Sequence, residues 1–207
     1  MAGGMVAGII FAGLSVSGAS ASTEAILTEE DAAIAAQLGA SALAAPEQEA
    51  LVDEWEAAKD SLQASVELGS GLSDVQHITL SNGTTLSVGV EPVSSPAAEG
   101  SVGARALTGN YKIWGSNGFA YMEYYVTFGA SGSYTTVIGS PRDMVIQLFA
   151  TTKSEGKWFT VPRRTETSSA GAWVRGWSRF TYPNNVATLE GGVEGFARNN
   201  NLVTSLF

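Results

Sequence analysis

Nine short segments rich in β-branched and aromatic residues follow one another between residue 109 and the end of the chain. Gly, Ser, Asn and Pro cluster between them, and these residues supply the backbone conformations of tight turns. The segments are Tyr111–Trp114, Phe119–Phe128, Tyr134–Ile138, Met144–Thr151, Lys157–Val161, Ala172–Tyr182, Ala187–Glu190, Val193–Ala197 and Leu202–Phe207. Short strands with a turn about every ten residues are typical of antiparallel β-sandwiches and barrels. We therefore expect residues 109–207 to form an all-β domain, with the even-numbered residues of 120–128 facing its core.

Residues 22–69 have the features of an acidic helical segment instead. Thr28 suits the N-cap of a helix whose first turn is acidic, where the helix dipole favours negative charge. Pro46 suits the start of a second helix, and Gly69 suits its end. One apolar stripe at helical spacing runs along this second helix, formed by Leu51, Trp55, Ala58, Leu62 and Val66.

The next two stretches predict a hairpin and a linker. Residues 70–90 alternate around Asn82 and Gly83, a pair that tolerates the positive φ angles of a tight hairpin turn. Residues 91–108 are rich in Pro, Ser, Ala and Gly and lack apolar periodicity, as linkers do. Taken together, the patterns predict an α+β fold: N-terminal acidic helices followed by a C-terminal antiparallel β-sandwich or barrel.

Charge is distributed unevenly between these two parts. Residues 23–108 hold 14 acidic and two basic side chains, whereas residues 109–207 hold nine basic and six acidic ones. Opposite net charges allow the two parts to attract each other. One interpretation is therefore a precursor, in which an acidic pro-region of about 22–108 covers the β domain until proteolysis near Arg105.

Residues 1–21 resemble an export signal. An apolar run over residues 5–16 precedes Ala19-Ser20-Ala21, the pattern of small residues that a signal peptidase recognises. The run is too short and too rich in Gly and Ser for a stable membrane span. The chain has no Cys, so a secreted form would have no disulfides. We expect a secreted bacterial protein, extracellular or at the cell surface.

The residue inventory excludes several kinds of catalysis. Without Cys there is no thiol nucleophile, and a single histidine, His77, cannot build a multi-histidine zinc site. No G-x-S-x-G and no phosphate-binding glycine loop is present, so we expect no cofactor and no metal. A carboxylate-based hydrolase remains open, with Glu190 and Glu194 on either side of a Gly-Gly turn as the candidate pair. A net charge of +3 over 109–207 is too weak for nucleic-acid binding.

The most suggestive cluster lies in the segment AWVRGWSRFTY. Strand alternation places Trp173, Arg175, Trp177 and Arg179 on one face, and Arg163 and Arg164 stand in a nearby segment. Indole rings stack on sugars, and guanidinium groups bind carboxylates and phosphates, so these residues are candidate ligand-binding residues. The alternative is that the tryptophans belong to the core and the arginines extend from its edges.

These observations favour a secreted, non-enzymatic binding protein. Its β domain would contact a cell-envelope glycan, a polyanion or a protein partner. Two alternatives remain: the precursor of an antibacterial or toxin-like effector, and the carboxylate-based hydrolase.

Overall fold

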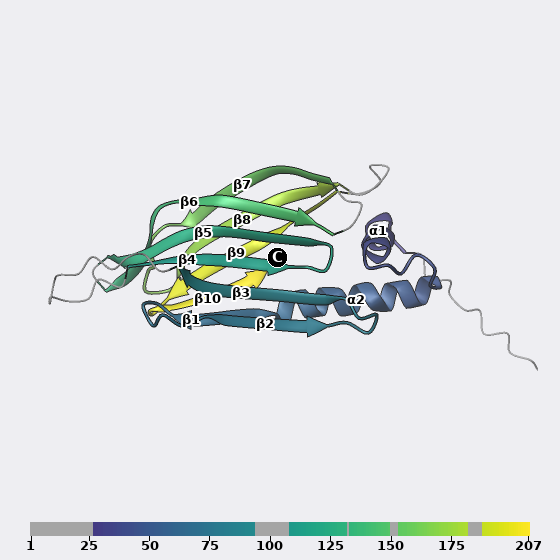
Figure 1. The fold of residues 1–207 in the computed structure, drawn as a ribbon, viewed down its shortest axis with the longest axis horizontal. Coiled ribbons are helices and arrows are strands. Elements are labelled where there is room, and N and C mark those ends of the chain that lie inside the picture. Colours follow the sequence, from purple (N-terminus) through teal and green to yellow (C-terminus); the bar gives the residue numbers. More distant parts are fainter. Residues whose placement is uncertain (1–26, 94–107, 132, 150–152, 182–187) are drawn as a thin grey trace, which may run out of the picture.

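A computed structural model describes residues 27–93, 108–131, 133–149, 153–181 and 188–207. Two five-stranded antiparallel sheets pack face to face (Figure 1). Sheet A has the strand order β1 (Gln63–Glu67), β10 (Asn201–Leu206), β9 (Thr188–Arg198), β8 (Ala172–Thr181) and β7 (Lys153–Arg163). Sheet B has the order β2 (Asp74–Thr79), β3 (Thr85–Val93), β4 (Gly109–Ser116), β5 (Ala120–Ser131) and β6 (Tyr134–Leu148).

Strands from the acidic part of the chain belong to both sheets. β1 pairs with β10, placing Gln63 opposite Ser205, and β3 pairs with β4, placing Glu91 opposite Lys112. The expected α+β fold is therefore wrong: the described chain is mostly β, with two short helices and one hydrophobic core shared by residues from before and after residue 109. The expectation of antiparallel β structure in the second half of the chain is confirmed.

The main error falls on residues 62–68, which we expected to continue the second helix. There Leu62, Ala64, Val66 and Leu68 are buried and the residues between them are exposed, so the segment alternates as a strand. Leu62 and Val66 lie four residues apart, a spacing that satisfies a helical stripe and also a two-residue alternation. Their pairing with the end of the chain decides in favour of a strand.

The two helices close one end of the sandwich (Figure 1). α1 (Glu29–Gln37) begins after Thr28, whose hydroxyl accepts the Asp31 N–H at 3.1 Å, and α2 spans Ala45–Ser61. Trp55 of α2 is buried, stacks on Phe119 and donates from Nε1 to the Asn117 carbonyl at 2.8 Å. The apolar stripe of α2 therefore covers the turn between β4 and β5. None of the described helices is long and apolar enough to cross a membrane.

The core lies between the two sheets. The even-numbered residues of β5 up to Phe128 are buried, which confirms the predicted core face of that strand. Tyr124 crosses the interior and donates from its hydroxyl to the Val193 carbonyl of sheet A at 3.2 Å. The expected turn at Gly191 and Gly192 is absent, because β9 runs unbroken through them. A Cβ at Gly192 would lie 2.1 Å from the Gly176 carbonyl oxygen, so this glycine permits a close approach of β8 and β9.

The sheets are also linked at both edges. At one edge the Asp74 carboxylate of β2 accepts the Ser65 N–H of β1 at 2.7 Å. At the other, the Val137 N–H of β6 donates to the Arg164 carbonyl, directly after β7, at 2.8 Å.

The proposed export signal, 1–21, lies outside the described residues, as does most of the predicted linker, whose first three residues belong to β3.

Candidate functional site

The outer face of sheet A carries the residues that the sequence singled out on β8. Trp173, Arg175 and Trp177 are half-buried and Arg179 is exposed, whereas the alternate residues from 172 to 180 are buried. The burial pattern thus places all four side chains on the solvent side of the sheet. The tryptophans lie outside the core between the sheets.

Two further aromatic residues extend this row onto the neighbouring strands. Trp158 of β7 lies opposite Trp177 and stacks on it, with ring centroids 4.7 Å apart and planes inclined by 30°. Phe196 of β9 lies opposite Trp173, with centroids 6.3 Å apart. Trp158 is 38% exposed and Phe196 37%. We call Trp158, Trp173, Trp177 and Phe196 the aromatic platform.

Sequence reasoning missed Trp158 and Phe196. Alternation within the predicted strand Lys157–Val161 places Trp158 on the opposite face from Phe159 and Val161. The sequence therefore did contain a signal that the Trp158 ring points outward. Its position beside Trp177 depends on the register of β7 and β8, which the sequence does not show.

Both arginines of β8 are paired with carboxylates of β9. The Arg175 Nε lies 3.1 Å from Glu194 Oε2, and Trp173 Nε1 donates to the same oxygen at 3.0 Å. The Arg175 guanidinium also covers the ring of Phe207, 3.6 Å from its centroid. Arg179 lies 3.0 Å from Glu190 Oε1. Each guanidinium charge is therefore balanced by a carboxylate on the adjacent strand.

The other two predicted arginines have different surroundings. Arg163 lies opposite Trp173 and donates to the Gly171 carbonyl at 3.0 Å, so it belongs to the same face at the edge of the sheet. Arg164 instead donates to the carbonyls of Val137 and Gly139 in β6 of sheet B, at 3.0 and 2.6 Å. The structure therefore brings Arg163 close to Trp173 and directs Arg164 toward sheet B.

A wide, shallow hollow of about 720 Å³ lies beside the platform, over the ends of β7, β8 and β9. Its described lining is Glu155, Arg179, Thr181, Thr188 and Glu190. The Thr181 hydroxyl donates to Glu155 Oε1 at 2.9 Å. The hollow thus combines two carboxylates, one guanidinium and two hydroxyls next to the stacked pair of tryptophans.

The proposed pair of catalytic carboxylates is not brought together. Glu190 and Glu194 lie on one continuous strand, and four residues along a strand correspond to about 13 Å. Glycosidases hold their two carboxyl groups about 5–9.5 Å apart. His77 is exposed on β2, and the nearby Asp74 is occupied by Ser65 and Gln76. Among the residues that the structure describes, no group of three or more potential ligands could hold a metal ion.

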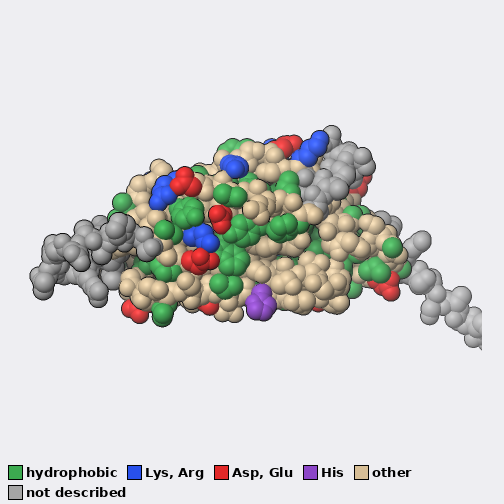
Figure 2. All heavy atoms as spheres, in the orientation of Figure 1, with side chains coloured by type: hydrophobic (Ala, Val, Ile, Leu, Met, Phe, Trp, Pro, Cys, Tyr) green, Lys and Arg blue, Asp and Glu red, His purple; other side chains and the backbone are tan. Residues whose placement is uncertain are grey.

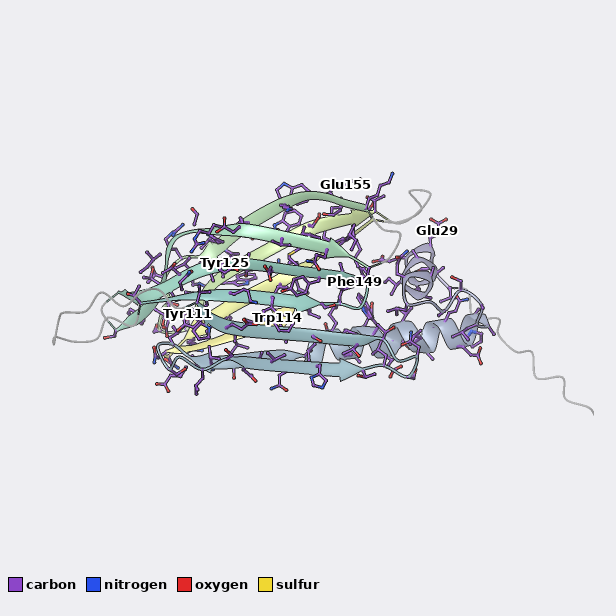
Figure 3. The ribbon with its side chains drawn as sticks, viewed as in Figure 1. Glu29, Tyr111, Trp114, Tyr125, Phe149 and Glu155 are labelled. Carbon is purple, nitrogen blue, oxygen red and sulfur yellow. The ribbon has the colours of Figure 1, made fainter. Side chains whose placement is uncertain are left out.

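The outer face of sheet B carries a related arrangement. Lys112 lies 3.0 Å from Glu91, and Trp114 donates to the same carboxylate at 2.8 Å. Acidic and basic side chains lie side by side among apolar ones on this face (Figure 2), and Trp114 and Tyr125 lie on its central strands (Figure 3). Burial and the hydrogen bond to Glu123 raise the pKa of Tyr121. In each sheet, therefore, one carboxylate binds both a tryptophan and a basic residue that lie two positions apart on the neighbouring strand. In sheet A, Glu194 binds Trp173 and Arg175. In sheet B, Glu91 binds Trp114 and Lys112.

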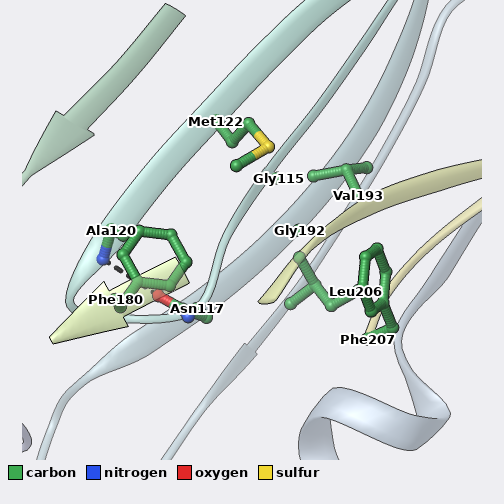
Figure 4. A pocket seen from close by; sticks show the side chains of 9 residues that line it. All are labelled: Gly115, Asn117, Ala120, Met122, Phe180, Gly192, Val193, Leu206 and Phe207. Carbon is green, nitrogen blue, oxygen red and sulfur yellow. Dashed lines mark hydrogen bonds between the residues drawn. The ribbon is translucent and has the colours of Figure 1, made fainter. Parts of the chain in front are cut away.

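A small cavity lies between the sheets, lined among others by Met122, Phe180 and Leu206 (Figure 4). Its volume is about 10 Å³, room for about one water molecule. This cavity is too small to hold a ligand larger than water.

Comparison with known proteins does not place the chain in a family. No protein-family model matches the sequence, and no curated protein matches it either. Among the solved structures that align with the chain is a hypothetical protein from Listeria monocytogenes EGD-e, with 15% identity and a TM-score of 0.40, over 69% of this chain and 100% of that one.

Proposed function

We propose that this is a secreted or cell-surface, non-enzymatic binding protein that contacts its ligand through the aromatic platform of sheet A. One observation carries the proposal: two aromatic pairs, Trp158 with Trp177 and Trp173 with Phe196, lie on one outer face, and one ring of each pair is more than one third exposed. Exposed apolar patches rimmed by polar groups commonly mark binding surfaces. The proposal that the protein is exported rests on the signal-like sequence of residues 1–21.

The platform suits flat, partly apolar ligands. Aromatic rings present large, rigid apolar faces, and indole stacks on the apolar faces of sugar rings and on other planar groups. The hydrogen bond from Trp173 to Glu194 and the stacking of Trp158 on Trp177 fix three of the rings before any ligand arrives. A preorganised surface loses little conformational entropy on binding.

Binding of a polyanion is less favoured. Arg175 and Arg179 already have carboxylate partners, so an anionic ligand would have to compete with Glu194 and Glu190. Releasing either arginine would leave a carboxylate unpaired on the same face, where it would repel the anion.

The alternatives also find less support. As a precursor, the protein would lose α1, α2 and β1–β3 on cleavage, and these elements supply many of the buried residues, including Trp55, Val88 and Val90. As a carboxylate-based hydrolase, it could not use Glu190 and Glu194 as its pair, because they lie about 13 Å apart along one strand. The two carboxylates that do share a hollow, Glu155 and Glu190, are bound to Thr181 and Arg179.

Co-sedimentation with insoluble glycans tests the proposal. We expect the protein to sediment with at least one of purified peptidoglycan sacculi, chitin and cellulose. The double variant Trp158→Ala, Trp177→Ala should bind at least about tenfold more weakly, because it removes two stacking faces at about 1 kcal/mol or more each.

Trp114→Ala provides the matched control, because Trp114 is a half-buried tryptophan on the outer face of the other sheet. It should bind like the unchanged protein, and circular dichroism should show that all variants are folded. Equal binding by the double variant and the unchanged protein, or sedimentation with none of the three glycans, would contradict the proposal.

A further inference from the structure

We infer that the ligand is a neutral, hydroxyl-rich glycan and that the hollow beside the platform binds one of its sugar units. This inference rests on the proposed function and adds the chemical class of the ligand and the place of its polar contacts.

The hollow and the stacked tryptophans form one continuous surface. Arg179 follows Trp177 by two residues on β8 and therefore shares its face. Across the β7–β8 pairing, Glu155 lies opposite Arg179, and Trp158 lies opposite Trp177. A glycan chain that stacks on the two indoles along the strands therefore reaches the polar hollow with its next units.

The polar groups of the hollow match sugar hydroxyls. One oxygen of Glu155 accepts from Thr181 and one oxygen of Glu190 pairs with Arg179. Within the described part of the chain, the second oxygen of each carboxylate and the Thr188 hydroxyl make no hydrogen bond. Carboxylates accept hydrogen bonds from hydroxyl groups strongly, and the Thr188 hydroxyl both donates and accepts.

The charge of the hollow selects against anionic glycans. Two carboxylates and one guanidinium line it, so its lining carries a net negative charge. Arg175 is held between Glu194 and the Phe207 ring, and Lys153, opposite Thr181 at the start of β7, is exposed and is not one of the described lining residues. Uronic acids, phosphates and sulfates would therefore meet two carboxylates inside the hollow and a guanidinium that already has a carboxylate partner, whereas neutral sugars would meet no such repulsion.

Isothermal titration with soluble oligosaccharides tests this inference. The probes are the hexamer of N-acetylglucosamine and cellohexaose, both neutral, and hexagalacturonate, which is anionic. The unchanged protein should bind at least one neutral hexamer at least about tenfold more tightly than hexagalacturonate. Its affinity should change less than about twofold when the salt concentration rises tenfold, because no net ion pair forms with a neutral ligand.

Glu190→Gln and Glu155→Gln should each weaken binding of the neutral hexamer about tenfold, the size expected for loss of a hydrogen bond to a charged group. The matched control is Glu67→Gln, which removes the same charge from the outer face of sheet A on the distant strand β1. It should leave the affinity unchanged. Thermal unfolding should show that the hollow variants remain folded.

Three outcomes would overturn the inference, and they are distinguishable. Preference for hexagalacturonate, strengthened in Glu190→Gln, would identify an anionic ligand. Loss of binding in the platform double variant, with Glu190→Gln and Glu155→Gln behaving like Glu67→Gln, would leave the platform as the site and exclude the hollow. Binding that depends on neither set would remove the proposed function as well.

Discussion

The carboxylate of Glu166 holds the turn between β9 and β10, because its Oε1 accepts the Asn199 N–H at 3.0 Å. The other oxygen accepts the Thr135 N–H at the start of β6, also at 3.0 Å. Asn199 and Asn200 both have positive φ, at 50° and 65°, as in the tight turns that join antiparallel strands. Glu166 is only 5% exposed and joins three segments that are distant in the sequence.

Stability should therefore fall at acidic pH through Glu166. Burial alone would raise its pKa, but the N–H groups of Thr135 and Asn199 outweigh burial and lower the pKa below its ordinary value. A group with a lower pKa in the folded state stabilises fully above its unfolded pKa of about 4.3, and this contribution is lost as the pH falls through the folded value. The predicted loss lies below about pH 5.

Glu166→Gln tests this expectation in urea unfolding measured from pH 7 to pH 3. The variant should lose about 1–3 kcal/mol at pH 7, because an amide nitrogen would face a backbone donor in a buried place. Its free energy of unfolding should also change less between pH 5 and pH 3 than that of the unchanged protein. Glu56→Gln, on the exposed side of α2, is the control. Parallel pH profiles for all three proteins would contradict the role given to Glu166.

Gly156 supports the position of the Trp158 ring. Its φ is +78°, and a Cβ there would lie 2.2 Å from the indole. Gly156→Ala should therefore displace Trp158 and weaken the near-ultraviolet circular dichroism that arises from its stacking on Trp177. Gly139 has a similar φ of +69° but no atom within 4 Å of an added Cβ. Gly139→Ala should thus cost only backbone strain, about 1–2 kcal/mol, and keep the signal. Equal spectra for both variants would refute this account.

Within α1 and α2, Trp55 should be the position at which substitution lowers stability most. Trp55→Ala removes a fully buried ring from its stack on Phe119 and should lower the free energy of unfolding by about 3–5 kcal/mol. Trp55→Phe keeps most of the packing but leaves the Asn117 carbonyl without its donor, so we expect a smaller loss, about 1–3 kcal/mol. Urea unfolding measures both. Losses below 1 kcal/mol for both would show that α2 is dispensable for the sandwich.

A fragment of residues 109–207 should fail to fold alone. Without β1 and β3, the strands β10 and β4 lose their hydrogen-bonded neighbours, and buried side chains such as Ile113 and Leu202 lose their cover. We expect no cooperative thermal transition and no near-ultraviolet circular dichroism from the fragment. A cooperative transition would instead revive the precursor interpretation, because the mature effector would then be stable by itself.

Local patterns predicted much of the fold. The start of α1 at Thr28, the inward face of β5 and the outward face of β8 all follow from signals within one element. The strand at Gln63–Glu67 did not follow, because its apolar spacing fits a helix equally well and its partner lies at the other end of the chain. Pairing over such a distance is a tertiary property that overrides local preference.

The site was predictable only in part for the same reason. Alternation alone placed Trp173, Arg175, Trp177 and Arg179 together. Their surroundings, however, come from β7 and β9: the stacking partner Trp158 and the carboxylates Glu190 and Glu194 that neutralise the arginines. Because the sequence does not show the strand registers, it did not reveal that Arg175 and Arg179 are paired with carboxylates and are therefore less available to anions.

The pairing of β1 with β10 joins residues that are about 140 positions apart, as between Ala64 and Thr204. Closing so long a loop early in folding is entropically costly, and proteins dominated by such distant contacts fold slowly. A growing polypeptide cannot complete sheet A until β10 has left the ribosome. We therefore expect sheet A, and the core that it shares with sheet B, to form only after β10 has emerged.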